Sequence, residues 1–455
     1  MKPSTFQPFN LSTLAAFCIL HSAFCIGSAF AAPNVDQNAV TLVQDSQSRL
    51  VTVSYTLTGE PAVVTVDFQT NTLANAAGNW ISIGDVNFTN VVGDVNQVVQ
   101  TGARVLHWQP CDTWPDQRIN GNRVRAVVKA WATNAPPDWC AVCLLSDSEI
   151  STRQQSDVTF NPVRRRYFAS KEAIPGGAQD RIYKTDYLLL RKIPAAGVVW
   201  MMGKSGFLDQ GAYPHKVMLT KDYYIGVYEI TYAQYYPIYG SVPQAFSDAN
   251  GENREIHPVG RAQWSQIRGD YDTYPWPQED GHEHEVASNS YLGLLRIRAG
   301  IDSFDLPADA QWEYACRAGS GTAHCNGGAN ASALNRVGWY KDNYNDGTTT
   351  APGSNHVHPV GQKEPNAWGI YDMEGNVSEL VLDWYEAHGA TLFPDADAIV
   401  ENPIGPANGT KKIWRGGYVW QDAFRCSCYA RVTGNAPAST DTCTGLRVVC
   451  DAVAK

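Results

Sequence analysis

The chain has 455 residues, of which 44% are hydrophobic and only 18% charged, and its formal net charge is −10. Because a single hydrophobic core stops growing at about 250–300 residues, this length predicts two folded units. The acidic balance repels phosphate backbones, and the densest basic run, Arg164–Arg166, is too short to follow a nucleic acid, which excludes nucleic acid as a partner. A content of 38 Gly, 25 Pro and 14 Trp favours a loop-rich globular protein with little regular helix.

Residues 1–31 have the pattern of a secretory signal peptide. A lysine near the start precedes an apolar segment from Leu11 to Phe30, and Ala29-Phe30-Ala31 is a small-x-small cleavage site. The alternative is a membrane anchor that is not cleaved. No second apolar stretch of about 20 residues follows, so we expect no membrane span after cleavage and a secreted or periplasmic protein.

Export changes what the cysteines mean. Of the 11 in the chain, Cys18 and Cys25 leave with the signal, so nine remain. An oxidising compartment favours disulfides among them. Because nine is odd, we expect at least one thiol to stay free or to pair with another chain.

Residues 33–145 predict a β-sandwich of the immunoglobulin or fibronectin kind. Short alternating runs such as RLVTVSYTLTG and RVRAVVKAWAT are separated by Gly, Asn and Pro. The region shows no ionisable cluster, which indicates a spacer or binding role. Cys140 and Cys143 lie at its end, where a redox pair would lack the βαβ setting it needs, so we expect a structural disulfide or two unpaired thiols.

Residues 146–184 are polar and irregular and predict a connector. Beyond them, residues 185–450 combine short aromatic strands such as YYIGVYEIT, one helix at DAQWEYACRAG and long loops rich in Gly, Asn and Asp. This texture predicts an α+β unit in which loops carry the functional residues.

Two short motifs resemble known sites. Gly203-Lys204-Ser205 looks like the end of a phosphate-binding loop, but Val198 stands where that motif needs glycine, so we interpret it as a hairpin turn. The run His282-Glu283-His284-Glu285 offers ligands for zinc or iron; a solvated loop is the alternative interpretation.

A third motif is Gly375-Asn376-Val377-Ser378-Glu379. The Asn376 side chain, the Val377 carbonyl and the Glu379 carboxylate supply the hard oxygen ligands that Ca²⁺ prefers. The alternative is a plain turn into a helix, with Asn376 as its cap and Glu379 at the favourable third position. The residues alone leave both interpretations open.

Several ordered blocks, among them FDLPADAQWEYACRAGS, HPVGQKEPNAWGIYDMEGNVSELVLDWY and WRGGYVWQ, resemble the formylglycine-generating enzyme, or sulfatase-modifying-factor, family. The resemblance runs from about Thr185 to Cys450. It implies a variant of the C-type-lectin-like fold with little regular secondary structure. The oxygen-dependent members of this family oxidise a sulfatase cysteine to formylglycine, using copper held by two cysteines.

The resemblance implies two calcium sites. The first matches the asparagine-valine-x-glutamate turn of the family at Asn376, Val377 and Glu379, although Ser378 and Leu380 replace the usual tryptophans. The second would use Asn335 and Asp346. We therefore expect Ca²⁺ as a cofactor.

The resemblance makes copper doubtful. Counted from Arg415, the position of the first copper cysteine is Gln421 and that of the second is Cys426; Tyr418 replaces a small hydroxyl residue. An amide cannot replace a thiolate around Cu(I). Cys428 would share a face with Cys426 in an extended segment, where a linear sulfur-copper-sulfur arrangement is strained. We therefore interpret the segment as mainly structural, with its arginines paired to loops.

Two hypotheses follow for the function. The first is a calcium-stabilised binding or interaction module for an exported protein or cell-surface ligand. The alternative is an oxygen-dependent oxidase that acts on an exported sulfatase cysteine or a small thiol, with Cys426 and Cys428 as catalytic residues. The incomplete copper pair leaves enzyme activity uncertain.

Overall fold

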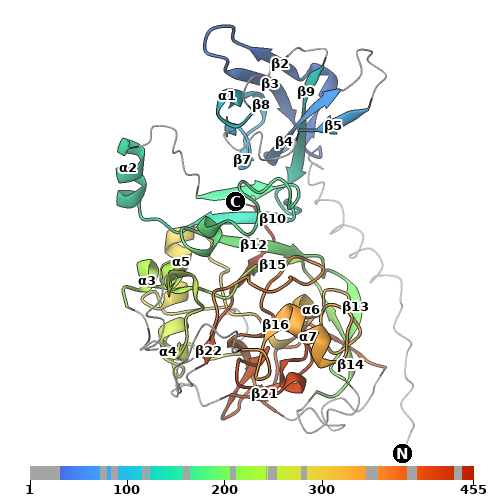
Figure 1. Cartoon of the computed structure of the whole chain (residues 1–455), viewed down its shortest axis with the longest axis vertical. Helices are drawn as coiled ribbons and strands as arrows, with labels where there is room; N and C mark the ends of the chain where they lie inside the picture. The colour runs from blue at the N-terminus through green and yellow to red at the C-terminus, as the bar shows by residue number, and fades with distance from the viewer. Residues whose placement is uncertain are drawn as a thin grey trace, which may run out of the picture.

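A computed structural model describes residues 31–454, apart from 72–78, 84–90, 115–118, 120–122, 157–163, 205–211, 242, 244–253, 278–283, 345–356, 387–396 and 435–442 (Figure 1). The signal-like residues 1–30 and Asp346 lie outside the described part. Within that part, none of the helices has both the length and the apolar character needed to cross a bilayer.

The N-terminal unit contains two antiparallel sheets, drawn in blue at one end of the molecule (Figure 1). The first has the order β1-β3-β8-β6, with β2 on β3; the second has the order β5-β4-β7, with β9 on β4. The strands are β1 (Asn34–Val35), β2 (Thr41–Gln44), β3 (Val51–Thr58), β4 (Ala62–Asn71), β5 (Trp80–Ser82), β6 (Val91–Gly93), β7 (Val98–Val99), β8 (Gly102–Trp108) and β9 (Val124–Ala132), with a short η1 (Gln37–Ala39) and α1 (Pro110–Thr113) between them.

Alternation along the strands builds the core of this unit. On β3, Val51, Val53, Tyr55 and Leu57 are buried while the residues between them are not, because side chains of a strand point to opposite faces in turn. Residues of both sheets join one hydrophobic cluster, in which the rings of Phe68 and Trp108 lie 4.3 Å apart. The predicted β-rich unit is therefore present.

The second unit is built on a five-stranded antiparallel sheet with the order β11-β10-β12-β15-β23. Its strands are β10 (Trp139–Cys143), β11 (Arg165–Phe168), β12 (Tyr187–Ile193), β15 (Tyr223–Gly226) and β23 (Val449–Asp451). Strand β10 pairs with both β11 and β12. The residues around Cys140 thus belong to the second sheet, although we assigned them to the first unit, and the expected connector contributes β11, α2 (Asp147–Ser156) and η3 (Arg181–Lys184).

Smaller sheets and short helices complete this unit, as the predicted α+β texture requires. The sheets comprise β13 (Val198–Met202), β14 (His215–Leu219) and β19 (Ile399–Glu401); β16 (Gly338–Trp339) and β17 (Glu374–Gly375); and β18 (Ser378–Trp384), β20 (Lys412–Arg415), β21 (Val432–Thr433) and β22 (Thr444–Gly445). The helices are α3 (Tyr232–Tyr239), η5 (Arg254–Ile256), α4 (Trp264–Ile267), α5 (Tyr291–Ala299), α6 (Asp309–Arg317), α7 (Ala331–Val337) and η6 (Ala423–Cys426).

Helix α6 is the one helix that the sequence predicted by itself. Its buried face includes Trp312, Glu313 and Cys316, and it ends at Arg317, before Ala318, whose φ of 45° is left-handed. Glu313 accepts a hydrogen bond from the backbone of Gly203 at 2.8 Å, which fixes the turn after β13 against the helix. Helix α6 thereby becomes the support on which the segments described below are assembled.

Candidate functional site

The Arg415-Gly416-Gly417 turn follows β20 and begins the segment that contains Gln421, Cys426 and Cys428. Gly416 and Gly417 have φ values of 82° and 70°, a left-handed backbone that favours glycine. A Cβ atom on Gly417 would lie 2.6 Å from Cys426 Sγ and 2.9 Å from the Arg425 carbonyl oxygen. The turn is therefore closed over Cys426.

Cys426 and Cys428 are both fully buried but contact different groups. Cys426 ends the short helix η6 under Gly417. The Cys428 thiol donates a hydrogen bond to Glu374 Oε1 at 2.9 Å. Burial raises the pKa of both thiols, so they are protonated at neutral pH and are not reactive thiolates. The extended conformation that we expected here is wrong at Cys426, where the chain makes a helical turn.

Gln421 stands at the position that matches the first copper cysteine of the resembling enzymes. Its side chain is half-buried, and its Oε1 has no hydrogen-bond partner among the described residues. Cu(I) selects soft sulfur ligands, which an amide oxygen is not. With Cys426 covered by the turn as well, the residues present do not fit a copper-thiolate pair.

Arg415 and Arg431 of the segment bond to loops, as we expected, through the carbonyls of Cys428, Ala430 and Glu386. Both arginines also form ion pairs with helix α6, which we did not expect. Arg415 donates to Asp309 and, at 3.0 Å, to Glu313, while Arg431 donates to Asp309 at 2.8 Å. All four side chains are buried. Removing one partner of such a buried pair costs about 3–5 kcal/mol, because the other charge stays without compensation. The network therefore fixes the turn on α6.

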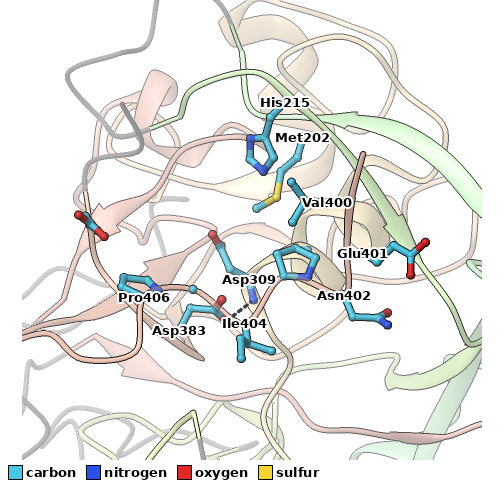
Figure 2. A pocket seen from close by; sticks show the side chains of 13 residues that line it. Met202, His215, Asp309, Asp383, Val400, Glu401, Asn402, Ile404 and Pro406 are labelled. Carbon is cyan, nitrogen blue, oxygen red and sulfur yellow. Dashed lines mark hydrogen bonds between the residues drawn. The ribbon is translucent and has the colours of Figure 1, made fainter. Parts of the chain in front are cut away.

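A cavity of about 400 Å³ opens beside this network (Figure 2). Asp309 of the network also lines the cavity, and its backbone N–H donates to Asp383 Oδ2 at 2.7 Å. The other lining residues are Met202, His215, Ala310, Glu386, Val400, Glu401, Asn402, Pro403, Ile404, Gly405 and Pro406. Apolar walls and carboxylates thus meet in one cavity.

The ionisation of the cavity is set by burial. Burial and then the charge of Asp309 raise the pKa of Asp383 to about 7. Burial lowers the pKa of His215, which keeps its ring neutral at neutral pH. The exposed Glu386 and Glu401 add carboxylates at the border. The carboxylates of Glu386 and Glu401 favour a positively charged ligand group, and the apolar walls favour an apolar stem beside it.

The Asn376 turn is held by a buried acid that the sequence did not reveal. Asn376 has a φ of 60°, and its Nδ2 donates to Glu229 Oε2 at 2.8 Å. Its Oδ1 accepts from the backbone N–H of His358 at 2.9 Å. Glu229 also accepts from the backbone N–H of Val377 at 3.2 Å. The polar atoms of the Asn376 side chain are therefore engaged within the protein.

Glu379 lies in strand β18, so the alternative interpretation of a helix capped by Asn376 is wrong. Its carboxylate accepts from Arg447 at 2.7 Å and from Trp312 Nε1 at 2.7 Å. Because both oxygens of Glu379 are paired and Asn376 is engaged, these groups as arranged do not fit a calcium ion. Calcium binding at Asn376, Val377 and Glu379 stays a prediction.

The remaining predicted ligands are dispersed. Asn335 is exposed on α7, where its carbonyl accepts from Lys363 Nζ at 2.9 Å; since Asp346 lies outside the described residues, the second calcium site stays a prediction. His282 and Glu283 also lie outside the described residues. His284 Nδ1 lies 3.0 Å from Asp305 Oδ2.

The cysteines give a result that the odd count did not anticipate. Cys111, Cys140, Cys143, Cys316, Cys325, Cys426, Cys428 and Cys450 are free thiols among the residues that the structure describes, so the disulfides that we expected do not join these eight. Cys140 and Cys143 are both buried in β10 as two unpaired thiols. Sequence reasoning missed a cluster formed by Cys316, Glu374 and Cys428. The only signal for Cys316 was its place on the apolar face of a predicted helix.

Comparison with known proteins gives a family match within the second unit. A family model described as a sulfatase-modifying factor enzyme 1-like domain matches residues 193–452. The chain is 28% identical over 197 residues to a protein of Paenibacillus barcinonensis named chaperone protein LppX, covering 39% of this chain and 68% of that one.

Similarity extends to an enzyme and to a solved structure. The chain is 33% identical over 153 residues to the formylglycine-generating enzyme of Thermomonospora curvata, covering 32% of this chain and 49% of the enzyme, so it spans about half of that relative's length. The solved structure of Treponema denticola variable protein 1 is 22% identical, with a TM-score of 0.45, covering 58% of this chain and 95% of that one.

Proposed function

Because the chain belongs to the sulfatase-modifying factor enzyme 1-like family, we propose that it is a member that binds a protein partner and does not oxidise a cysteine. One observation carries this proposal. Gln421 takes the position of a copper cysteine, and Cys426 is fully buried under the Gly417 turn. Oxidation chemistry of the family kind needs a pair of accessible thiolates, which these two positions do not offer.

The cavity beside the turn is the binding site that we propose. Its volume of about 400 Å³ is in the range of a ligand side chain or small molecule. Glu386 and Glu401 supply carboxylates, Asp383 supplies a carboxyl group that becomes ionised around pH 7, and Val400 and Ile404 supply apolar surface. We infer that it takes a lysine or arginine side chain, with its aliphatic stem, from a partner polypeptide. The partner would be an exported protein or a cell-surface ligand.

The relative named a chaperone supports a role in binding proteins. A chaperone acts by contact with another chain, which is the type of activity that a cavity without redox ligands can perform. Calcium is left out of the proposed function, because Asn376 and Glu379 use their oxygens within the protein. Export and the C-type-lectin-like label of the fold remain part of the proposal.

The oxidase alternative rests on relatives such as the formylglycine-generating enzyme of Thermomonospora curvata. The test is to incubate the full chain with Cu(I), oxygen and a peptide that carries the Cys-x-Pro-x-Arg sulfatase motif, and to weigh the peptide by mass spectrometry. We expect the peptide mass to stay unchanged. Conversion of the thiol to an aldehyde, abolished by Cys426→Ser, would establish the alternative and reject the binding module.

Binding is tested with two peptides that differ at one position. One has an arginine between apolar residues and the other has glutamine in its place, and calorimetry measures both affinities for the full chain. We expect the arginine peptide to bind more tightly, and Asp383→Asn to weaken it. Glu255→Gln, an exposed acid in η5 outside the cavity lining, is the matched control. Equal affinities for the two peptides would reject the proposed ligand.

A further inference from the structure

Three buried side chains from separate elements converge beside the Gly416 turn. Cys316 belongs to α6, Glu374 to β17, and Cys428 follows η6. One ligand atom of each lies within 4.8 Å of the others. The exposed fractions of the three residues are 0%, 1% and 0%. The fold thus brings two sulfur atoms and a carboxylate to one point that solvent does not reach.

The donor set and its spacing match a thiophilic metal ion. Zinc binds cysteine sulfur at about 2.3 Å and carboxylate oxygen at about 2.0–2.2 Å, with four ligands in a tetrahedron. Such a tetrahedron places its ligand atoms about 3.5–3.8 Å apart. Binding would therefore move Cys428 Sγ and Glu374 Oε1 apart from their present 2.9 Å, and would bring a pair at the 4.8 Å limit closer by about 1 Å. The hard carboxylate favours zinc over Cu(I), which selects soft sulfur pairs.

Neighbouring groups hold the Glu374 carboxylate in place. Oε1 accepts from the backbone N–H of Cys325 at 2.7 Å, and Oε2 lies 2.8 Å from His324 Nδ1. Contacts of this kind, which orient a ligand from behind, are typical of metal sites. The orientation of the Glu374 carboxylate therefore depends on these two contacts as well as on its hydrogen bond with Cys428.

A third thiol lies close to the same point. Cys325 is buried, and its backbone N–H donates to Glu374 Oε1 at 2.7 Å. Cys325 is therefore adjacent to the Glu374 member of the cluster. Its sulfur is not one of the ligand atoms that lie within 4.8 Å of one another, so it would complete a tetrahedron only by moving toward the ion.

We propose that Cys316, Cys428 and Glu374 form a structural zinc site, with Cys325 as the fourth ligand. The zinc ion replaces the thiol protons, which pass to solvent, so no electron is transferred. The site is distinct from a copper pair, since it uses neither Gln421 nor Cys426, and it does not depend on the proposed function.

The consequence is a cross-link between three elements. Zinc joins the segment after η6 to α6 and β17 through three protein ligands, and a fourth from Cys325 would close the site, as in other structural sites. It thereby takes the place of the disulfides that we expected and did not find.

The test uses the full chain, reduced and freed of metal, and titrated with Co²⁺. We expect a sulfur-to-cobalt charge-transfer absorption that saturates at one ion per chain and disappears when Zn²⁺ displaces the cobalt. Cys316→Ser and Cys428→Ser should each lose this absorption. Cys443→Ser should keep it, because Cys443 is a buried cysteine outside the cluster.

If the serine variants fail to fold, X-ray absorption at the zinc edge of the unmodified chain tests the proposed ligands directly. We expect sulfur ligands at about 2.3 Å together with a lighter ligand. A shell of nitrogen and oxygen only, binding of Cu(I) without Zn²⁺, or a Cys316–Cys428 disulfide in protein purified without reductant would each overturn the proposal.

Discussion

A substitution of Glu379 can distinguish a carboxylate that binds calcium from one that pairs only with other residues of the protein. Its carboxylate pairs with the fully buried Arg447, so Glu379→Gln should lower the free energy of unfolding by about 3–5 kcal/mol. We expect the same loss in excess Ca²⁺ and in EDTA, measured by urea denaturation. Glu364→Gln removes an exposed pair with Arg336 and should cost no more than about 1 kcal/mol.

The calcium prediction would be supported by a different pattern of results. If Ca²⁺ raised the melting temperature of the unmodified chain, and Glu379→Gln abolished that shift, the ion would have to reach this carboxylate. Binding to the native state alone would then add about 2.7 kcal/mol at a hundredfold excess over Kd.

Asp383 predicts a pH dependence of stability. Its pKa is raised from 3.8 to about 7 by burial, so the native state holds a proton that the unfolded state releases above its own pKa. This group therefore destabilises the fold increasingly as the pH rises from about 4 to about 7, and by a constant amount above that. Asp383→Asn keeps an acceptor for the Asp309 N–H and removes the charge.

We accordingly expect Asp383→Asn to be more stable than the unmodified chain, with an advantage that is larger at pH 8 than at pH 5. Thermal or chemical unfolding at both pH values measures it. An advantage that is independent of pH would show that the Asp383 carboxyl titrates normally.

For single residues, the sequence predicted which side chains lie in the segment better than it predicted their interaction partners. The spacing from Arg415 located Gln421 and Cys426 in the segment, and both positions could be interpreted before the fold was known. Glu229 and Arg447 could not, because each meets the turn from a distant part of the chain. Such pairings depend on the fold and leave no local pattern.

Among the elements, period and composition predicted α6 and the strands of the N-terminal unit. The sequence left the turn at Asn376 ambiguous, because an asparagine followed by a glutamate is also typical of a helix start. In the structure the residues after the turn form strand β18, which pairs with β20 and β22. We assigned the segment around Cys140 to the first unit, because the apolar sequence pattern of a buried strand does not show to which sheet the strand belongs.

The Gly416-Gly417 turn is an element whose rigidity can be measured. Gly417→Ala introduces a left-handed alanine and a Cβ that meets Cys426 Sγ, whereas Gly240→Ala has a similar φ of 80° with nothing within 4 Å. The backbone cost of about 1–2 kcal/mol is common to both. We expect Gly417→Ala to lose about 1–3 kcal/mol more in chemical unfolding. Equal losses would mean that the turn is not closed tightly over Cys426.

For the whole molecule, composition and the family resemblance predicted two units, and the first is β-rich as expected. The boundary between them depends on β10, which is buried on both sides in its sheet between β11 and β12. Residues before β10 are also tied to the second unit. Ala454 N donates to the Thr133 carbonyl at 2.7 Å, and the Tyr224 hydroxyl donates to the Pro137 carbonyl at 2.5 Å.

Two truncated chains test where the second unit begins. A chain that starts at Thr133 retains β10 and the contacts of Tyr224 and Ala454, so it should unfold in one cooperative transition. A chain that starts at Ser146, the first residue of the predicted connector, leaves the facing edges of β11 and β12 without their central partner. Because unpaired buried edges promote association, we expect this shorter chain to aggregate or to lack a cooperative transition. Equal unfolding curves for the two chains would place the boundary after Leu145 and make β10 dispensable to the second unit.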